Sequence, residues 1–285
     1  MKTVHELLDL LNLEPIEENI FRGYSKSVGS NTVFGGQVLA QSLKAAMQTV
    51  PEDRFVHSLH AYFVLPGDLQ RPIVFQVERI RDGGSFTTRR VKAIQKGEAI
   101  FMMSASFQLQ QQGYDHQMEM PKVPKPEDLV SWEDLAAKFS HMLPENMRRF
   151  LNLERPIEFR PVELANPAIP MKSEPYRHIW FKAKGDMPDD PRIHQMVLAY
   201  TSDYNLLTTA ILPHGDVANF SNLQIASLDH GMWFHRDFRV DEWLLYAIDS
   251  PSASNARGFT RGNIFTESGK LIASVVQEGL IRPKS

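Results

Sequence analysis

A carboxylate stands where the residue pattern predicts a buried helix face. Asp203 has helical spacing from Tyr200 and Leu207, so a helix expected over residues 191–211 would carry its carboxylate on an apolar stripe. Burial disfavours the charged form of a carboxylate and raises its pKa, which suits a general base acting near neutral pH. The alternative interpretation is a capping or internally satisfied Asp at an interruption of the helix, because Asp often disturbs helices locally.

Two further polar side chains lie on apolar faces of predicted strands. Period-two alternation places Gln277 beside Ala273 and Val275, and it places Ser227 on the face of Ile225. Taken alone, each pattern is also typical of a core amide or hydroxyl that has found a hydrogen-bond partner. Taken together, a carboxylate, a hydroxyl and an amide could accept a proton from water and hold that water in place.

Several other kinds of chemistry have no signature in the sequence. No Gly-x-Ser-x-Gly pentapeptide occurs, which disfavours a covalent acyl-serine hydrolase, and no Gly-x-Gly-x-x-Gly or P-loop occurs, so no cofactor is expected. The chain has no cysteine, which excludes thiolate metal sites and Cys nucleophiles. His57 and His60 point to opposite faces of a predicted strand, so we expect no metal. His57 remains a candidate for substrate contact, with a satisfied core histidine as the alternative.

Composition and charge narrow the class of protein. The 285 residues are 42% hydrophobic, which allows one large or two medium globular domains. The net charge is −3 without long basic runs, so nucleic acid is not an expected partner. The longest apolar runs last about six residues, far short of the roughly 20 that a membrane helix needs. An amphipathic N-terminal helix and the absence of cysteine favour a cytoplasmic protein.

The elements that must position these side chains occur in the same order twice. In the first half, a helix over residues 34–49 precedes four strands, expected over residues 55–65, 73–81, 86–95 and 99–110 with turn residues between them. In the second half, strands over 157–164 and 176–184 and the helix over 191–211 precede strands over 223–234, 243–249, 256–265 and 270–281. Each half is therefore expected to be a long helix wrapped by an antiparallel sheet.

The two halves also match in sequence. Residues 58–64 align with residues 228–234, and the turn at Gly97 corresponds to the turn at Gly269. A long period with one element order indicates a duplicated domain rather than a solenoid. We expect an N-terminal repeat over 1–110, a Pro-rich linker over 111–156 with short helices over 130–139 and 145–151, and a C-terminal repeat over 157–285.

Five segments carry a resemblance to a known family. They are residues 33–41 (VFGGQVLAQ), 56–63 (VHSLHAYF), 225–236 (IASLDHGMWFHR), 257–259 (RGF) and 276–279 (VQEG). In this order they resemble the acyl-CoA thioesterase II (TesB-type) family over nearly the whole chain. The resemblance implies an α+β double hot-dog fold, in which two helices are each wrapped by an antiparallel sheet. It also implies hydrolysis of fatty acyl-CoA to free fatty acid and CoA, and a homo-oligomer, dimer or tetramer.

The resemblance also assigns roles to individual residues. It implies a catalytic group of Asp203, Ser227 and Gln277, in which water attacks the thioester directly; a bacterial member of the family has Thr where this chain has Ser227, which keeps the hydroxyl. Backbone N–H groups at a helix start are candidates to polarise the thioester oxygen. These could come from Gly35 and Gly36, where the alternative is a tight turn, or from the helix start after 188–191.

Two alternatives to the thioesterase remain open at this point. A hot-dog enoyl-CoA hydratase uses an Asp and a His on one helix, and the segment from Asp189 to His194 (DDPRIH) superficially resembles that arrangement, with one extra residue between Pro and His. A non-catalytic acyl-CoA-binding module would bind tightly without turnover. The trio of polar side chains argues against the second alternative.

Overall fold

A computed structural model describes residues 1–139, 152–164, 171–218 and 222–284. The helices are α1 (Val4–Leu11), α2 (Gly35–Met47), α3 (Trp132–Phe139), α5 (Pro191–Ser202) and α6 (Leu206–Thr209), with short 3₁₀ turns at Pro126–Asp128 and Leu212–His214. The strands are β1 (Glu14–Glu17), β2 (Ile20–Gly23), β3 (Phe55–Phe63), β4 (Ile73–Asp82), β5 (Phe86–Gln95), β6 (Glu98–Gln108), β7 (Ile157–Pro161), β8 (Tyr176–Ala183), β9 (Leu223–Ser227), β10 (Asp229–Phe234), β11 (Leu244–Ser254), β12 (Arg257–Thr266) and β13 (Leu271–Pro283). The helix predicted over 145–151 lies outside the described residues.

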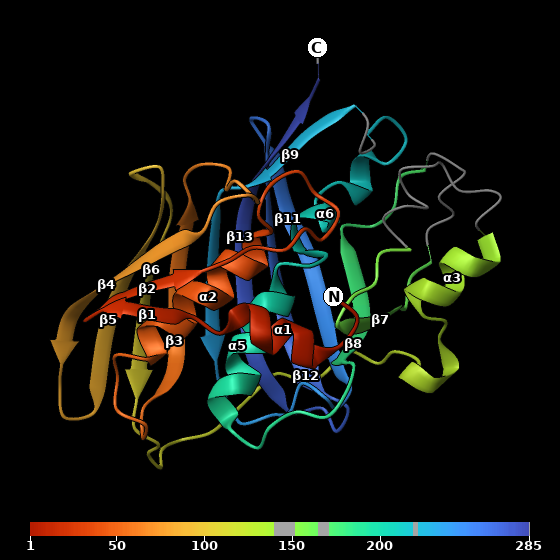
Figure 1. Cartoon of the computed structure of the whole chain (residues 1–285). Helices are drawn as coiled ribbons and strands as arrows, with labels where there is room; N and C mark the ends of the chain where they lie inside the picture. The colour runs from red at the N-terminus through yellow and green to blue at the C-terminus, as the bar shows by residue number, and fades with distance from the viewer. Residues whose placement is uncertain (140–151, 165–170, 219–221, 285) are drawn as a thin grey trace.

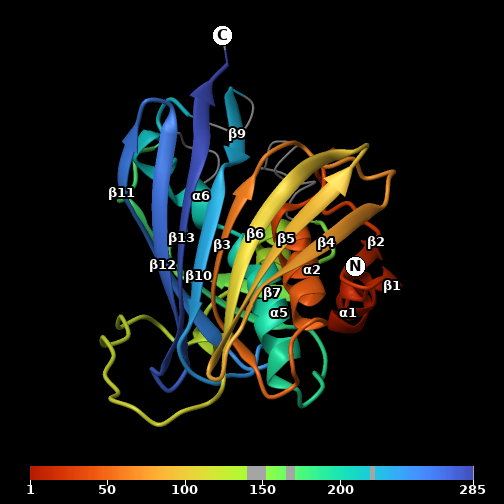
Figure 2. The same ribbon diagram turned by 90° about the vertical axis from the view of Figure 1, so that its left-hand side faces the viewer.

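The strands form one antiparallel sheet that curves around the two long helices. Its order is β1-β2-β4-β5-β6-β3-β10-β13-β12-β11-β8-β7, and β9 also pairs with β13. Both α2 and α5 lie on the same side of the sheet and pack against each other, as Figures 1 and 2 show from two directions. The fold is therefore the predicted α+β architecture of two helices wrapped by antiparallel strands.

The two repeats join at the centre of the sheet. The strands that were matched in sequence, β3 and β10, pair with each other in a register that runs from Asp229 opposite Tyr62 to Trp233 opposite Ser58. The corresponding turns at Gly97 and Gly269 both adopt positive φ angles, of 81° and 87°. This is the backbone region that glycine enters without steric cost, so the paired glycines mark equivalent hairpins.

The core lies between the helices and the inner face of the sheet. The residues of α2 from Gly36 to Met47 are buried except Lys44, and α5 is buried from His194 onward. Helix α1 adds Val4, Leu7 and Leu11, all fully buried. In the described part of the chain, no helix is both long and apolar enough to cross a membrane.

The single helix predicted over 191–211 is wrong. Helix α5 ends at Ser202, Asp203 is its C-terminal cap, and a separate short helix, α6, begins after Asn205. Asn205 has a φ of 67°, a left-handed conformation that Asn tolerates better than most residues and that breaks the helix. Asp203 is therefore at a helix end rather than in the middle of a helical stripe.

The strand predicted over 223–234 is also interrupted. On β13, Ser227 pairs with Gly279 but Gly231 pairs with Val276, so the register shifts by one residue around Leu228. The carboxylate of Asp229 accepts the Glu278 N–H at 2.6 Å beside this bulge. A bulge adds one residue to one strand and re-aims the side chains on either side of it.

The hairpin of β1 and β2 was not predicted. All residues of β1 are exposed and one is Pro15, so this strand lacks the alternation that identifies a half-buried strand. The segment that follows the first repeat runs along the second one, where Gln117 bonds to Gly269 and Leu271 and the Trp180 indole N–H donates to the Pro124 carbonyl.

Candidate active site

The carboxylate of Asp203 receives hydrogen bonds from both repeats. The Gly36 backbone N–H donates to Oδ2 at 2.9 Å, and the Gln277 amide Nε2 donates to Oδ1 at 2.8 Å. Gly36 lies in the first turn of α2 and Gln277 lies on β13. Asp203 is half-buried, so part of its surface remains open to a small molecule. Gly36 and Gln277, which were both predicted from the sequence to belong to the site, therefore both bind the carboxylate of Asp203.

The start of α2 reaches Asp203 because two glycines bring no side chains. A Cβ on Gly36 would lie 2.3 Å from the Tyr200 carbonyl oxygen, and one on Gly35 would lie 2.6 Å from Asp203 Oδ2. Phe34 fills the space beside them, with its ring 5.3 Å from that of Tyr200 and 4.6 Å from that of Tyr204. Only glycine permits this close approach between the start of α2 and the end of α5.

The bulge at Leu228 turns Ser227 toward the same place. Ser227 pairs with Gly279, which lies on the buried face of β13 together with Gln277. Without the extra residue, Ser227 would face away from the side chains that β10 directs inward. Ser227 is half-buried, and its hydroxyl lowers the pKa of the Asp203 carboxyl and so favours its ionised form. The three side chains predicted to act together are thus brought together.

Gln277 presents one free hydrogen-bonding atom to the site. Its side chain is fully buried, and its Nε2 lies 2.8 Å from Asp203 Oδ1 and 3.3 Å from His230 Nδ1. Its Oε1 is buried with no hydrogen-bond partner among the described residues. Buried acceptors are nearly always partnered in folded proteins, so this oxygen marks a place for a donor that arrives from outside.

Burial dominates the electrostatics of Asp203. Loss of hydration raises the pKa of its carboxyl above the ordinary value of 3.8, while hydrogen bonds from Gln277, Gly36 and Ser227 oppose the rise. The N-terminal end of the α2 dipole also favours a negative charge at this point. The carboxyl is therefore a stronger base than an exposed Asp, yet it is held by donors that keep its ionised form accessible.

His230 belongs to the site but was not among the candidate residues identified from the sequence. His230 is 1% exposed and contacts Gln277 through Nδ1 and Ser202 through Nε2. The sequence could have indicated His230 as a histidine at a buried position of a central strand. Its partners lie on α5 and β13, and residue spacing along the chain could not identify them. In the described part of the chain, no three His, Cys, Asp or Glu side chains are grouped closely enough to hold a metal ion.

His57 lies away from this group. Its Nε2 is 2.8 Å from Ser106 Oγ, and its ring packs against Phe86. Phe63 at the other end of β3 approaches Gly35, so six residues of strand place His57 about 20 Å from the carboxylate. The repeat alignment explains this position, because His57 occupies in the first repeat the place that Ser227 occupies in the second.

The other proposed features also lie at the far end of α5. The start of α5 is capped by Asp190, which accepts the Arg192 N–H at 2.9 Å, and the helix of 12 residues places this end about 18 Å from Asp203. His194 accepts the Val240 N–H through Nδ1 at 3.1 Å. The Asp and His that resemble a hydratase pair therefore serve as a helix cap and as a structural acceptor.

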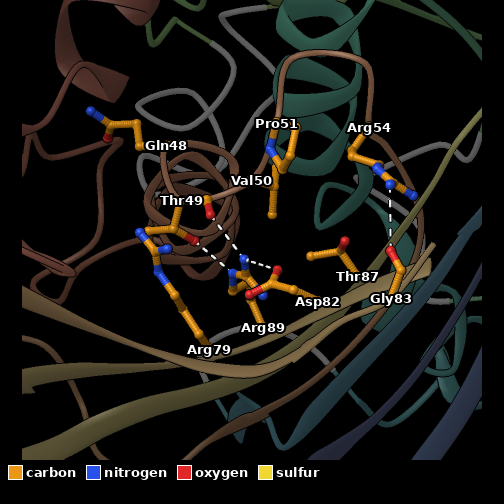
Figure 3. Close-up of a pocket in the computed structure, with 10 residues that line it drawn as sticks. All are labelled: Gln48, Thr49, Val50, Pro51, Arg54, Arg79, Asp82, Gly83, Thr87 and Arg89. Atoms are coloured by element: carbon orange, nitrogen blue, oxygen red, sulfur yellow. Dashed lines mark hydrogen bonds and ion pairs between the residues drawn. The ribbon is translucent and has the colours of Figure 1, made fainter. Parts of the chain in front are cut away.

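A separate polar depression of about 430 Å³ lies at the C-terminal end of α2. Figure 3 shows its side chains, among which Arg89 bonds to Thr49 and Asp82 while Arg54 reaches the Gly83 carbonyl. Arg89 pairs with Asp82 and Arg54 pairs with Asp53, and the end of a helix dipole disfavours anions there. The Asp203 group, and not this depression, is therefore the candidate active site.

Comparison with known proteins places the chain among thioesterases. The sequence profile of the family described as Acyl-CoA thioesterase matches residues 147–280, and that of the Acyl-CoA thioesterase N-terminal domain matches residues 22–108. Acyl-CoA thioesterase 2 of Haemophilus influenzae is 44% identical over 98% of both chains. The crystal structure of acyl-CoA thioesterase II TesB2 from Mycobacterium marinum is 46% identical, covers 97% of this chain and 98% of its own, and has a TM-score of 0.80. A hot-dog protein from Alicyclobacillus acidocaldarius, 20% identical over 99% of both chains with a TM-score of 0.77, shares the fold.

Proposed function

The chain belongs to the acyl-CoA thioesterase II family, and we propose that it hydrolyses fatty acyl-CoA thioesters by direct attack of a water molecule that Asp203 deprotonates. The observation that carries this mechanism is the half-buried Asp203 carboxylate beside the unpartnered Oε1 of Gln277. A water molecule has two hydrogens, and these two acceptors offer one place for each. With both hydrogens engaged, a lone pair of the water oxygen is left to attack the thioester carbon.

The steps follow from this placement. The water oxygen bonds to the thioester carbon while one of its protons passes to Asp203, which gives a tetrahedral intermediate. The intermediate collapses with cleavage of the C–S bond, and the departing CoA sulfur takes the proton back from Asp203. The products are a free fatty acid and CoA, and the carboxylate is restored.

Ser227 and Gly36 support this chemistry in different ways. The Ser227 hydroxyl favours the ionised form of Asp203 and can contact the bound water. Gly36 uses its N–H on Asp203, so it positions the base. Each carboxylate oxygen has two lone pairs, which leaves Asp203 able to accept a proton despite these donors. No metal or other cofactor is needed for these steps.

A single assay tests this function against both alternatives. The purified protein is mixed with saturated and enoyl acyl-CoA substrates of several chain lengths while free thiol and enoyl absorbance are followed. Thiol release that is lost in Asp203→Asn protein, prepared identically, supports the proposal. Loss of enoyl absorbance without thiol would indicate a hydratase, and tight binding without either change would indicate a binding module.

We further propose that the protein is a cytoplasmic homo-oligomer, a dimer or tetramer, with repeats over 1–110 and 157–285 and a linker over 111–156. Absence of cysteine and an N-terminal helix whose Val4 and Leu7 are buried in the core support a folded protein of a reducing compartment. Exposed Tyr62 and Met102 on the outer face of the sheet support a contact between copies. Light scattering during size-exclusion chromatography measures the oligomeric state, and fractionation of cells that express the tagged chain tests the compartment.

A further inference from the structure

His230 lies directly across from Gln277 in the sheet. The pairing of Gly231 with Val276 places the preceding residue of β10 beside the following residue of β13, and both side chains point to the buried face. His230 is 1% exposed and Gln277 is fully buried. The imidazole therefore has no access to bulk water and must satisfy its two nitrogens with protein groups.

Ser202 determines which imidazole nitrogen carries the proton. The Ser202 hydroxyl donates its one hydrogen to the Ala199 carbonyl oxygen at 2.9 Å, as is common for Ser in helices. Its oxygen lies 2.9 Å from His230 Nε2, and with its hydrogen already used it can only accept there. The proton of the neutral imidazole therefore sits on Nε2, and Nδ1 is a bare acceptor.

The bare Nδ1 in turn determines how the Gln277 amide lies. The two hydrogens of Gln277 Nε2 are directed at Asp203 Oδ1 and at His230 Nδ1, at 2.8 and 3.3 Å. A rotated amide would instead turn Oε1 toward two acceptors and would lose both hydrogen bonds. The observed orientation leaves Oε1 with no hydrogen-bond partner in the described part of the chain.

We propose that His230, held in one tautomer by Ser202, is a positioning residue that fixes the Gln277 amide so that its Oε1 faces the attacking water. This inference rests on the proposed function, because it concerns the same water. It adds to the three proposed side chains a series of hydrogen-bonded groups that runs from Gln277 through His230 and Ser202 to the Ala199 carbonyl. Burial lowers the pKa of His230 to about 3, so the acceptor at Nδ1 persists across the working pH range.

A double-mutant cycle between His230 and Gln277 tests the proposal. We expect His230→Leu to lower kcat about ten-fold with KM changed less than about two-fold, because one hydrogen bond no longer holds the amide. In a Gln277→Ala background, His230→Leu should change kcat by less than about two-fold, since the group it positions is absent. An undiminished loss in that background, or wild-type kcat in the single variant, would overturn the proposal.

The pH profile separates positioning from mere stability. In His230→Leu, the Gln277 amide is free to move away from Asp203 and no longer donates to it. The pKa of Asp203 then rises, and the acid limb of kcat moves to higher pH. The control is His194→Leu, because His194 is also buried, at 2% exposed, but lies near the start of α5 and far from Asp203. An equal shift of the acid limb in both variants would show that general loosening is responsible.

Two further measurements keep the test decisive where His230→Leu fails to fold. Ser202→Ala removes only the hydroxyl that fixes the tautomer, and we expect it to lower kcat about three-fold with the same direction of acid-limb shift. Imidazole ¹⁵N shifts of the labelled protein report the tautomer directly. Protonation at Nε2 is expected for His230 in the wild type, and protonation at Nδ1 would contradict the proposal whatever the kinetics show.

The outcomes distinguish this inference from the proposed function. Wild-type activity of Asp203→Asn would remove the general base and with it the mechanism. Loss of activity in Asp203→Asn together with wild-type kcat and pH profile in His230→Leu would leave the mechanism in place and overturn only the role of His230.

Discussion

The backbone N–H of Gly36 donates to Oδ2 of Asp203 across 2.9 Å, although the two residues belong to different repeats. The start of one long helix thus holds the carboxylate that caps the end of the other. A single hot-dog repeat could not form this contact. In the proposed site, the first repeat supplies a backbone donor and the second supplies the three side chains that we propose react with or hold water.

Asp203→Asn should lower kcat by about three orders of magnitude, because an amide cannot take the proton from water. Asn is nearly isosteric with Asp, so the unfolding midpoint should stay close to that of the wild type. Thiol release and thermal unfolding measure the two effects. A variant that retains wild-type turnover would remove Asp203 from the mechanism.

Gln277→Ala should move the acid limb of kcat to higher pH. The amide donates to the ionised carboxylate and so lowers the pKa of Asp203, which burial has raised above 3.8. Without this donor the pKa rises further, and the base is protonated at pH values where the wild type is active. The measurement is kcat for thiol release from pH 4 to 9 in steps of about 0.5.

The matched control for this shift is Gln41→Ala. Gln41 is also fully buried, but its amide donates to the Leu10 and Tyr24 carbonyls and not to Asp203. Its acid limb should stay in place even though the variant loses three hydrogen bonds, one of them accepted from Gln37 Nε2. An acid limb that stays in place in Gln277→Ala, or moves to lower pH, would contradict the assignment of Asp203 as the base.

Gly36→Ala should disrupt both stability and activity. The new Cβ would lie 2.3 Å from the Tyr200 carbonyl, a backbone atom that cannot move without shifting α5. We expect a loss of about 1–3 kcal/mol in the free energy of unfolding and a lower kcat, because the donor to Asp203 is displaced. Gly84→Ala is the control, since no atom lies within 4 Å of its Cβ position. Urea unfolding of both variants makes the comparison, and equal stability would contradict the close packing.

Arg89→Leu should destabilise the protein without changing its kcat. Arg89 is 1% exposed and donates to the side chain and carbonyl of Thr49 and to the Arg81 carbonyl, which would be left unpartnered. Loss of these bonds should cost about 2–4 kcal/mol in the free energy of unfolding. The site is unaffected because it lies at the opposite end of α2.

The control for Arg89→Leu is the next residue on the same strand. Arg90 points to the other face, is 52% exposed and pairs with Glu78. Its replacement by Leu should change the free energy of unfolding by less than about 1 kcal/mol. A fall in kcat of folded Arg89→Leu protein would indicate that the polar depression contributes to catalysis after all.

Local sequence patterns predicted the helices and strands, because the buried side of each element is marked by the order of its own apolar and polar residues. Alternation identified β3 to β6 to within two residues or so at each end, and it placed Gln277 on the buried face of β13. The same patterns failed where a conformation is set by contacts from elsewhere. Asn205 breaks the helix because its own backbone is left-handed, and the bulge at Leu228 lies where the pairing with β13 shifts by one residue.

The sequence by itself determined that the chain is a duplicated helix-and-sheet unit and that a carboxylate, a hydroxyl and an amide lie among apolar residues of the second unit. Only the tertiary structure decided which of these groups meet and which others join them. A register shift of one residue turns Ser227 inward, and two glycines let the start of α2 reach Asp203. His230 joins through contacts to Ser202 and Gln277 from two other elements. Spacing along the chain encodes which side of an element is buried, whereas hydrogen bonds between distant segments depend on how those segments pack, and no local pattern contains that information.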